Sequence, residues 1–75
     1  MTYQEKQDRW DRLTLCLEFD GQYEKTFTAF ERIYIHCERA KLLRSEPFEQ
    51  PPELEQKIQD TLHRISRINW KSYKK

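Results

Sequence analysis

The side chains best suited to chemistry in this chain are two cysteines and two histidines, and their spacing does not suit a metal site. His36 and Cys37 are adjacent, so on a helix they would point about 100° apart and could not easily share an ion. Cys16 and His63 stand alone, and no CxxC, HxxxH or CxxH pair supplies half of a zinc site. We therefore expect two surface histidines, two free and buried thiols, and no metal or other cofactor.

Motifs for catalysis or nucleotide binding are also missing from the sequence. It contains no G-x-S-x-G elbow, no P-loop and no dinucleotide fingerprint, and its one glycine, Gly21, cannot build a phosphate cradle. Carboxylates are plentiful, but they fall at exposed helical positions, whereas paired catalytic carboxylates need a walled cleft that shifts their pKa values. The sequence therefore predicts a protein that is not an enzyme and has no small-molecule substrate.

Cationic and aromatic side chains alternate near the C-terminal end of the chain. Residues 62–75 carry five cations and no acidic residue, a net charge of +5 where the whole chain has +1. Cations can contact phosphates and rings can stack on unpaired bases, so nucleic-acid binding is the alternative function. A basic helix end also stabilises its own dipole, which is the plainer interpretation. The candidate nucleic-acid contacts are Arg64, Arg67, Trp70, Lys71, Tyr73, Lys74 and Lys75.

Aromatic and branched residues recur at helical spacing in the middle of the chain. Phe27 and Phe30 are most simply explained as core residues. Ile33 and Ile35 point to different sides of a helix, so at least one of them should be exposed in a monomer. A second apolar face on a small protein usually marks an interface. The candidate protein interface comprises Tyr23, Phe27, Phe30, Ile33, Tyr34 and Ile35.

Two helices are expected to position these residues. The first spans about 2–19, because Thr2 and Glu5 form a capping-box pair in which each side chain satisfies a free backbone N–H of the other. The chain is then expected to turn at Asp20-Gly21, since glycine commonly ends a helix. A second helix over about 22–44 carries the aromatic residues and returns antiparallel to the first.

A proline-rich connection over 45–52 separates this hairpin from a third helix over about 52–69. Proline lacks the N–H that a continuing helix needs, but Pro52 suits the first turn of a new one. Phe48 is expected to pack back onto the helices. The buried stripe of the third helix is predicted to be Leu54, Ile58, Leu62, Ile65 and Ile68.

The sequence thus predicts an all-α fold, a three-helix domain over residues 1–75 with a basic tail at 70–75. It consists of an antiparallel helical hairpin and a third helix after the proline-rich connection. The alternative is one long helix over 2–44 that dimerises. That helix would place Asp20 in its seam beside Gly21, which weakens helices, so the hairpin is favoured.

Length and composition favour association with another molecule. The chain has 75 residues, of which 36% are hydrophobic and 36% charged, so its core must be lean. Chains of this size bury only about 60% of their unfolded surface and often need a partner subunit. No apolar run approaches the roughly 20 residues of a membrane span, and the polar N-terminus is unlike a signal peptide. We therefore expect a cytoplasmic protein-protein interaction module, regulatory or accessory, that forms a homodimer.

Overall fold

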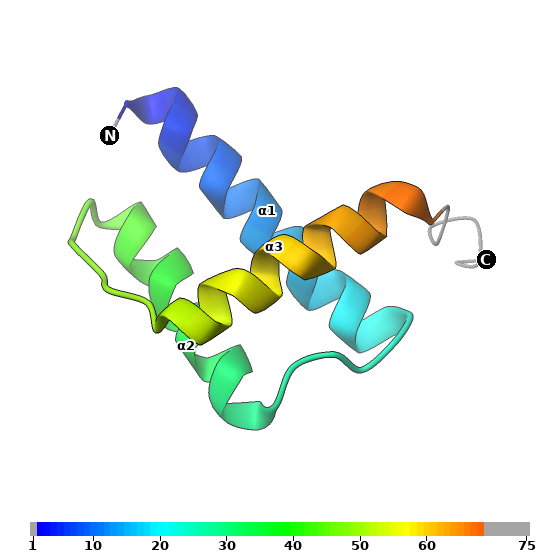
Figure 1. Cartoon of the computed structure of the whole chain (residues 1–75). Helices are drawn as coiled ribbons and strands as arrows, with labels where there is room; N and C mark the ends of the chain where they lie inside the picture. Colours follow the sequence, from blue (N-terminus) through cyan, green and yellow to red (C-terminus); the bar gives the residue numbers. More distant parts are fainter. Residues whose placement is uncertain (1, 69–75) are drawn as a thin grey trace.

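The computed structural model describes residues 2–68, which form three helices and no strand. These are α1 (Tyr3–Gln22), α2 (Ala29–Leu43) and α3 (Pro52–Arg67). Figure 1 shows α3 crossing in front of the other two helices. Helix α1 packs against both α2 and α3, so it is the common support of the fold. The predicted all-α, three-helix architecture is confirmed.

Helix α1 begins as predicted but ends later. The N–H of Glu5 donates to Thr2 Oγ1 at 3.1 Å, and the N–H of Thr2 donates to Glu5 Oε1 at 2.8 Å, which completes the capping box. The predicted turn at Asp20-Gly21 is wrong, because α1 continues through both residues to Gln22. Gly21 does not adopt a positive φ. One glycine inside a helix costs about 1 kcal/mol, which packing around its neighbours can offset.

Helix α2 begins seven residues later than predicted, at Ala29, because a second capping box fixes its start. The N–H of Glu31 donates to Thr28 Oγ1 at 3.2 Å, and the N–H of Thr28 donates to Glu31 Oε1 at 2.8 Å. The six residues before Ala29 form a loop, so the alternative of one helix over 2–44 is also wrong. The Thr-x-x-Glu signal was present in the sequence, but the aromatic spacing suggested a helix that ran through it.

Helix α3 matches its prediction closely. Pro52 opens the helix, which ends at Arg67 instead of 69. Leu54, Ile58 and Ile65 are buried. The other two predicted stripe residues, Leu62 and Ile68, are partly buried against the same clusters.

The core consists of two small apolar clusters, and each contains residues of both α1 and α3. The larger contains Leu13, Cys16, Phe27, Ile35, Leu54 and Ile58, and the smaller contains Phe19 and Ile65. Both cysteines are free, as predicted. Burial raises the pKa of the Cys16 thiol to about 12, so this thiol is not reactive. Cys37, in contrast, is exposed, which corrects the expectation that both thiols are buried.

The C-terminal end of α2 is a Schellman motif built on a serine. Ser45 has φ 56°, in the left-handed region that favours glycine. Its N–H donates to the carbonyl of Leu42 at 3.1 Å, and the N–H of Glu46 donates to that of Lys41 at 2.9 Å. The connection to α3 therefore leaves α2 through a conformation that is strained for a residue with a Cβ.

Replacing Ser45 by glycine should stabilise the domain. We expect Ser45→Gly to raise the free energy of unfolding by about 0.5–1 kcal/mol, because glycine enters the left-handed region without steric cost. Urea denaturation followed by circular dichroism measures the change. The matched control is Ser66→Gly in α3, which should not stabilise, since Ser66 is helical. Equal effects of the two substitutions would contradict the assignment of strain to Ser45.

Candidate protein interface on helix α2

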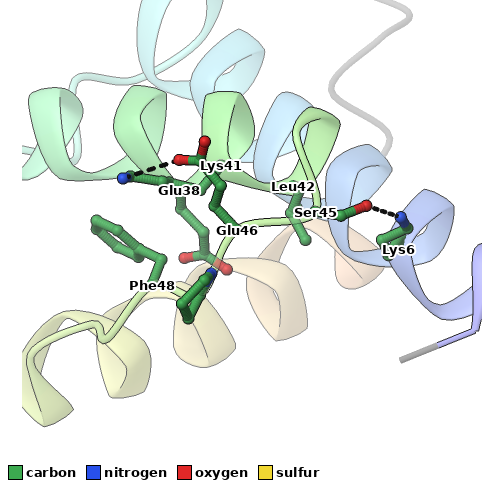
Figure 2. Close-up of a pocket in the computed structure, with 8 residues that line it drawn as sticks. Lys6, Glu38, Lys41, Leu42, Ser45, Glu46 and Phe48 are labelled. Atoms are coloured by element: carbon green, nitrogen blue, oxygen red, sulfur yellow. Dashed lines mark hydrogen bonds and ion pairs between the residues drawn. The ribbon is translucent and has the colours of Figure 1, made fainter.

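An open groove of about 540 Å³ lies beside the C-terminal half of α2. Figure 2 shows its lining, in which Lys6 donates to Ser45 and Lys41 pairs with Glu46 at 3.0 Å. These polar groups are paired with one another and do not converge on an empty space. Residues 2–68 contain no group of three histidine, cysteine or acidic side chains that could hold a metal ion.

One arginine at the centre of the molecule joins all three helices. Arg9 of α1 donates from Nε to Glu38 of α2 at 2.5 Å and from Nη2 to Glu55 of α3 at 2.6 Å. The hydrogen bond to Glu38 raises the pKa of Arg9, and Glu55 adds to that effect against the opposing effect of burial. The hydrogen bond from Arg9 likewise lowers the pKa of Glu55. The side of α2 that carries Glu38 is thereby fixed toward α1 and α3.

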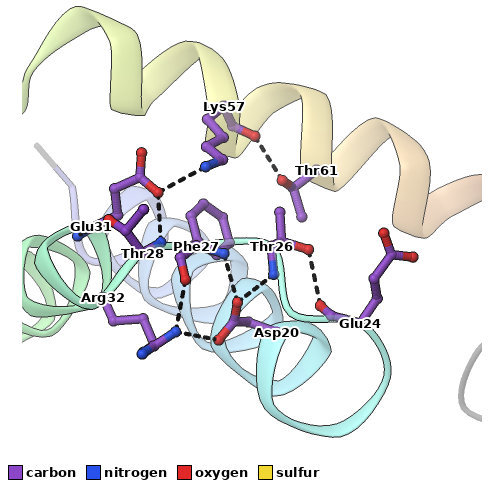
Figure 3. A network of polar contacts seen from close by, with 9 residues as sticks. All are labelled: Asp20, Glu24, Thr26, Phe27, Thr28, Glu31, Arg32, Lys57 and Thr61. Carbon is purple, nitrogen blue, oxygen red and sulfur yellow. Dashed lines mark hydrogen bonds and ion pairs between the residues drawn. The ribbon is translucent and has the colours of Figure 1, made fainter.

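A buried aspartate organises the loop before α2, as Figure 3 shows. Asp20 Oδ1 accepts from the N–H of Thr26 at 2.6 Å and from that of Phe27 at 2.7 Å. Its Oδ2 pairs with Arg32 at 3.2 Å. Burial alone would raise the pKa of Asp20, but the hydrogen bonds from Phe27 and Thr26 and the charge of Arg32 outweigh it and lower this pKa. The carboxylate thus places Phe27 in the core and sets the rotation of α2.

All five charged residues of α2 interact with partners inside the molecule. Two of them, Arg32 and Glu38, belong to the networks just described. The other three also have neighbours: Glu31 pairs with Lys57 at 2.8 Å, Arg39 lies over the Trp10 ring at 4.2 Å, and Lys41 pairs with Glu46 at 3.0 Å.

The side of α2 that faces away from α1 and α3 is largely apolar, and its one charged residue, Lys41, pairs with Glu46. Phe30 is 78% exposed, Ile33 56% and Leu43 72%. Tyr34 and Cys37 are exposed as well, and Tyr34 meets Phe48 edge-on with ring centroids 6.3 Å apart. We call this surface the outer face of α2 and define it as Ala29, Phe30, Ile33, Tyr34, His36, Cys37 and Ala40. Leu43 lies apart from it, beside Tyr3 and Trp10 of α1.

The structure divides the six predicted interface residues between surface and core. Ile33 is exposed and Ile35 is fully buried, as expected for two residues on different sides of a helix. Ile35 and Phe27 are therefore not available to a partner, which corrects their place in the predicted interface. Tyr23 is exposed in the loop after α1, with its ring centroid 5.1 Å from that of Phe19. The exposure of Phe30 corrects its interpretation as a core residue. Phe30, Ile33 and Tyr34 remain as the interface candidates on the outer face.

Sequence reasoning missed Leu43 and Cys37 as surface residues. A readable signal existed for Leu43, because Ala29, Ile33, His36, Ala40 and Leu43 step by 4, 3, 4 and 3. That series was obscured by the stronger aromatic series, which includes the buried Phe27.

The predicted nucleic-acid residues are only partly within the described chain. Arg64 donates to both carboxylate oxygens of Glu24, at 2.8 and 2.5 Å, so it is held by a partner within the chain. Arg67 is exposed. The remaining predicted contacts, Trp70, Lys71, Tyr73, Lys74 and Lys75, lie outside the described residues.

Comparisons with models of protein families, with curated proteins and with solved structures found no match for this chain. None of its described helices is long and apolar enough to cross a membrane.

Removing the charge of Asp20 should weaken the fold. We expect Asp20→Asn to lower the free energy of unfolding by about 2 kcal/mol at pH 7, because charge-assisted hydrogen bonds to buried N–H groups are lost. The matched control is Asp11→Asn, a change at an exposed carboxylate of α1, which should have little effect. Urea denaturation by circular dichroism measures both.

The effect of Asp20 should also depend on pH. Its pKa is lower in the folded protein than in the unfolded chain, where it is about 3.9. Its contribution is therefore fully present above the unfolded value and is lost as the pH falls through the folded one. The difference between wild type and Asp20→Asn should shrink as the pH is lowered below about 4. A constant difference would contradict the role assigned to the ionised carboxylate.

Proposed function

We propose that this chain is a small, non-enzymatic protein-protein interaction module that self-associates through the outer face of α2. The observation that carries the proposal is the reversed distribution of side chains on that helix. Its charged residues have partners within the molecule, whereas bulky apolar residues such as Phe30 and Ile33 face solvent. A surface helix of an isolated domain normally shows the opposite arrangement.

Exposed apolar side chains gain free energy when a partner covers them. Burying a phenylalanine or isoleucine side chain is worth about 1.5–3 kcal/mol. Phe30 and Ile33 are neighbours on one face, so a single partner helix can cover both. A module of this kind would serve as a regulatory or accessory subunit by helix packing. We propose that it acts in the cytoplasm.

A charge placed on the outer face should abolish self-association without unfolding the protein. We expect Ile33→Glu to raise the dimer dissociation constant by more than about 30-fold, because it removes about 2 kcal/mol of apolar burial and adds a charge that would need desolvation. Sedimentation velocity over a concentration series measures the constant. Since Ile33 is exposed in the single chain, circular dichroism should remain unchanged.

The matched control adds the same carboxylate on another helix. Gln56→Glu lies at an exposed position of α3, away from the outer face of α2, and should leave the association unchanged. A wild-type chain that stays monomeric at millimolar concentration would contradict self-association.

Nucleic-acid binding by the basic C-terminal residues remains the alternative proposal. It has less support, because Arg64 is engaged by Glu24. A salt titration with DNA and RNA separates the two functions, since phosphate contacts make affinity fall steeply with salt. Under the main proposal no salt-sensitive binding is expected. Binding that is salt-sensitive and lost on deletion of residues 70–75 would favour the alternative.

A further inference from the structure

We infer that two copies of the chain pair antiparallel along α2, so that each bulky residue of one copy lies against a small residue of the other. In this arrangement Phe30 packs against Ala40 of the second copy, and Ile33 packs against its Cys37. The inference rests on the proposed self-association and adds the orientation and register of the two helices.

The seam of this pairing is the middle of the outer face. Phe30, Ile33, Cys37 and Ala40 step by 3, 4 and 3, the spacing of residues that face a partner helix in a coiled coil. On a helical wheel the seam lies opposite Ile35, which is fully buried in the core. The seam is therefore directed away from the chain's own helices.

The sizes of the seam residues favour the antiparallel orientation. The two large residues, Phe30 and Ile33, occupy the N-terminal half of the seam, and the two small ones, Cys37 and Ala40, occupy the C-terminal half. In a parallel pair, large residues would face large residues at one end of the seam and small residues would face small ones at the other. The large residues would hold the helices apart, and the small residues would leave a gap. Antiparallel helices set large against small along the whole seam, which allows close packing at a constant separation.

The charges of α2 favour a second copy over a charged partner. Each charged residue of the helix already has a partner in its own chain, and the seam itself is uncharged. A charged peptide would therefore find no counter-charge in the seam. A second copy brings the same uncharged surface, as the symmetric interface of a two-fold dimer requires.

The extent of the surface indicates a reversible dimer. A helix of 15 residues is about 22 Å long. A pair of such helices covers less than the roughly 800 Å² per partner of a standard stable interface. Tyr34, which is exposed beside Phe30, flanks the seam and widens the contact. We therefore expect a reversible dimer.

Disulfide formation between single cysteines tests the register. The native chain, which carries Cys37, is mixed with an isotope-labelled chain bearing Ile33→Cys and Cys37→Ser, under a mild thiol-disulfide buffer. The inference places these two thiols directly opposite each other. Two copies of residue 33, or two of residue 37, would be offset by about 6 Å along the helix axes. Added to the distance between the two helices, this offset takes their Cα atoms beyond the roughly 7 Å that a disulfide allows. Cys16 can remain, because it is fully buried.

The expected result is a labelled-unlabelled disulfide that forms at least tenfold faster than either homodimeric disulfide. The matched control replaces the labelled chain by one with Gln56→Cys and Cys37→Ser, whose exposed thiol lies off the seam and should cross-link slowly. A second pair of chains carries Phe30→Cys on one and Ala40→Cys on the other, both with Cys37→Ser. These two thiols should link as the first pair does, so a weakened dimer in either pair alone would not decide the test.

The failures of the two proposals are distinguishable. Sedimentation that shows only monomer at millimolar concentration overturns self-association and the register with it. A dimer in which the 33–33 and 37–37 disulfides dominate is parallel and overturns the inference alone. A dimer whose cross-linking is no faster than the Gln56→Cys control uses another face, and this also overturns the inference.

Discussion

The fold depends on the arginine that joins its three helices. Helices α2 and α3 both pack on α1, and Arg9 of α1 binds Glu38 and Glu55, one on each. A half-buried ion pair stabilises only when its geometry is good and its remaining hydrogen-bonding groups are satisfied. Glu38 meets that condition, because Gln50 also donates to it from the connection before α3. The position of α2 thus follows from a polar contact as much as from its buried Ile35.

The apolar outer face of α2 is a consequence of this polar interior. With Glu38 turned toward Arg9, and Arg32 toward Asp20, these two charged residues of α2 occupy the side that an amphipathic helix usually fills with apolar ones. The helix has only one other side, and that side carries Phe30 and Ile33. No rotation of α2 could bury them without breaking these ion pairs.

The sequence was a good guide where one local signal acted alone. Spacing and the opening Pro52 predicted α3 closely, and Thr2 with Glu5 predicted the start of α1. The prediction failed between residues 20 and 28, where Asp20 accepts hydrogen bonds from residues six and seven positions later. Helical periodicity does not encode such contacts. The same loop moved Phe27 off α2, but Phe27 is still buried, as the sequence suggested. The sequence also suggested a core position for Phe30, which is 78% exposed, because spacing alone does not show which side of α2 the ion pairs turn inward.

Dimerisation along α2 would cover the apolar side of this helix, which the single chain leaves exposed. In the single chain, α1 has a helix packed on each of two sides, whereas α2 is supported chiefly by α1. A second α2 on the outer face would turn this helix from an edge element into a central one, with its ion pairs on one side and an apolar seam on the other. The domain would then obtain from a partner the apolar burial that its two small core clusters supply only in part. The exposed apolar residues of α2 and the small core have the same cause. Apolar residues that could have enlarged the core lie instead on the surface that a second copy would cover.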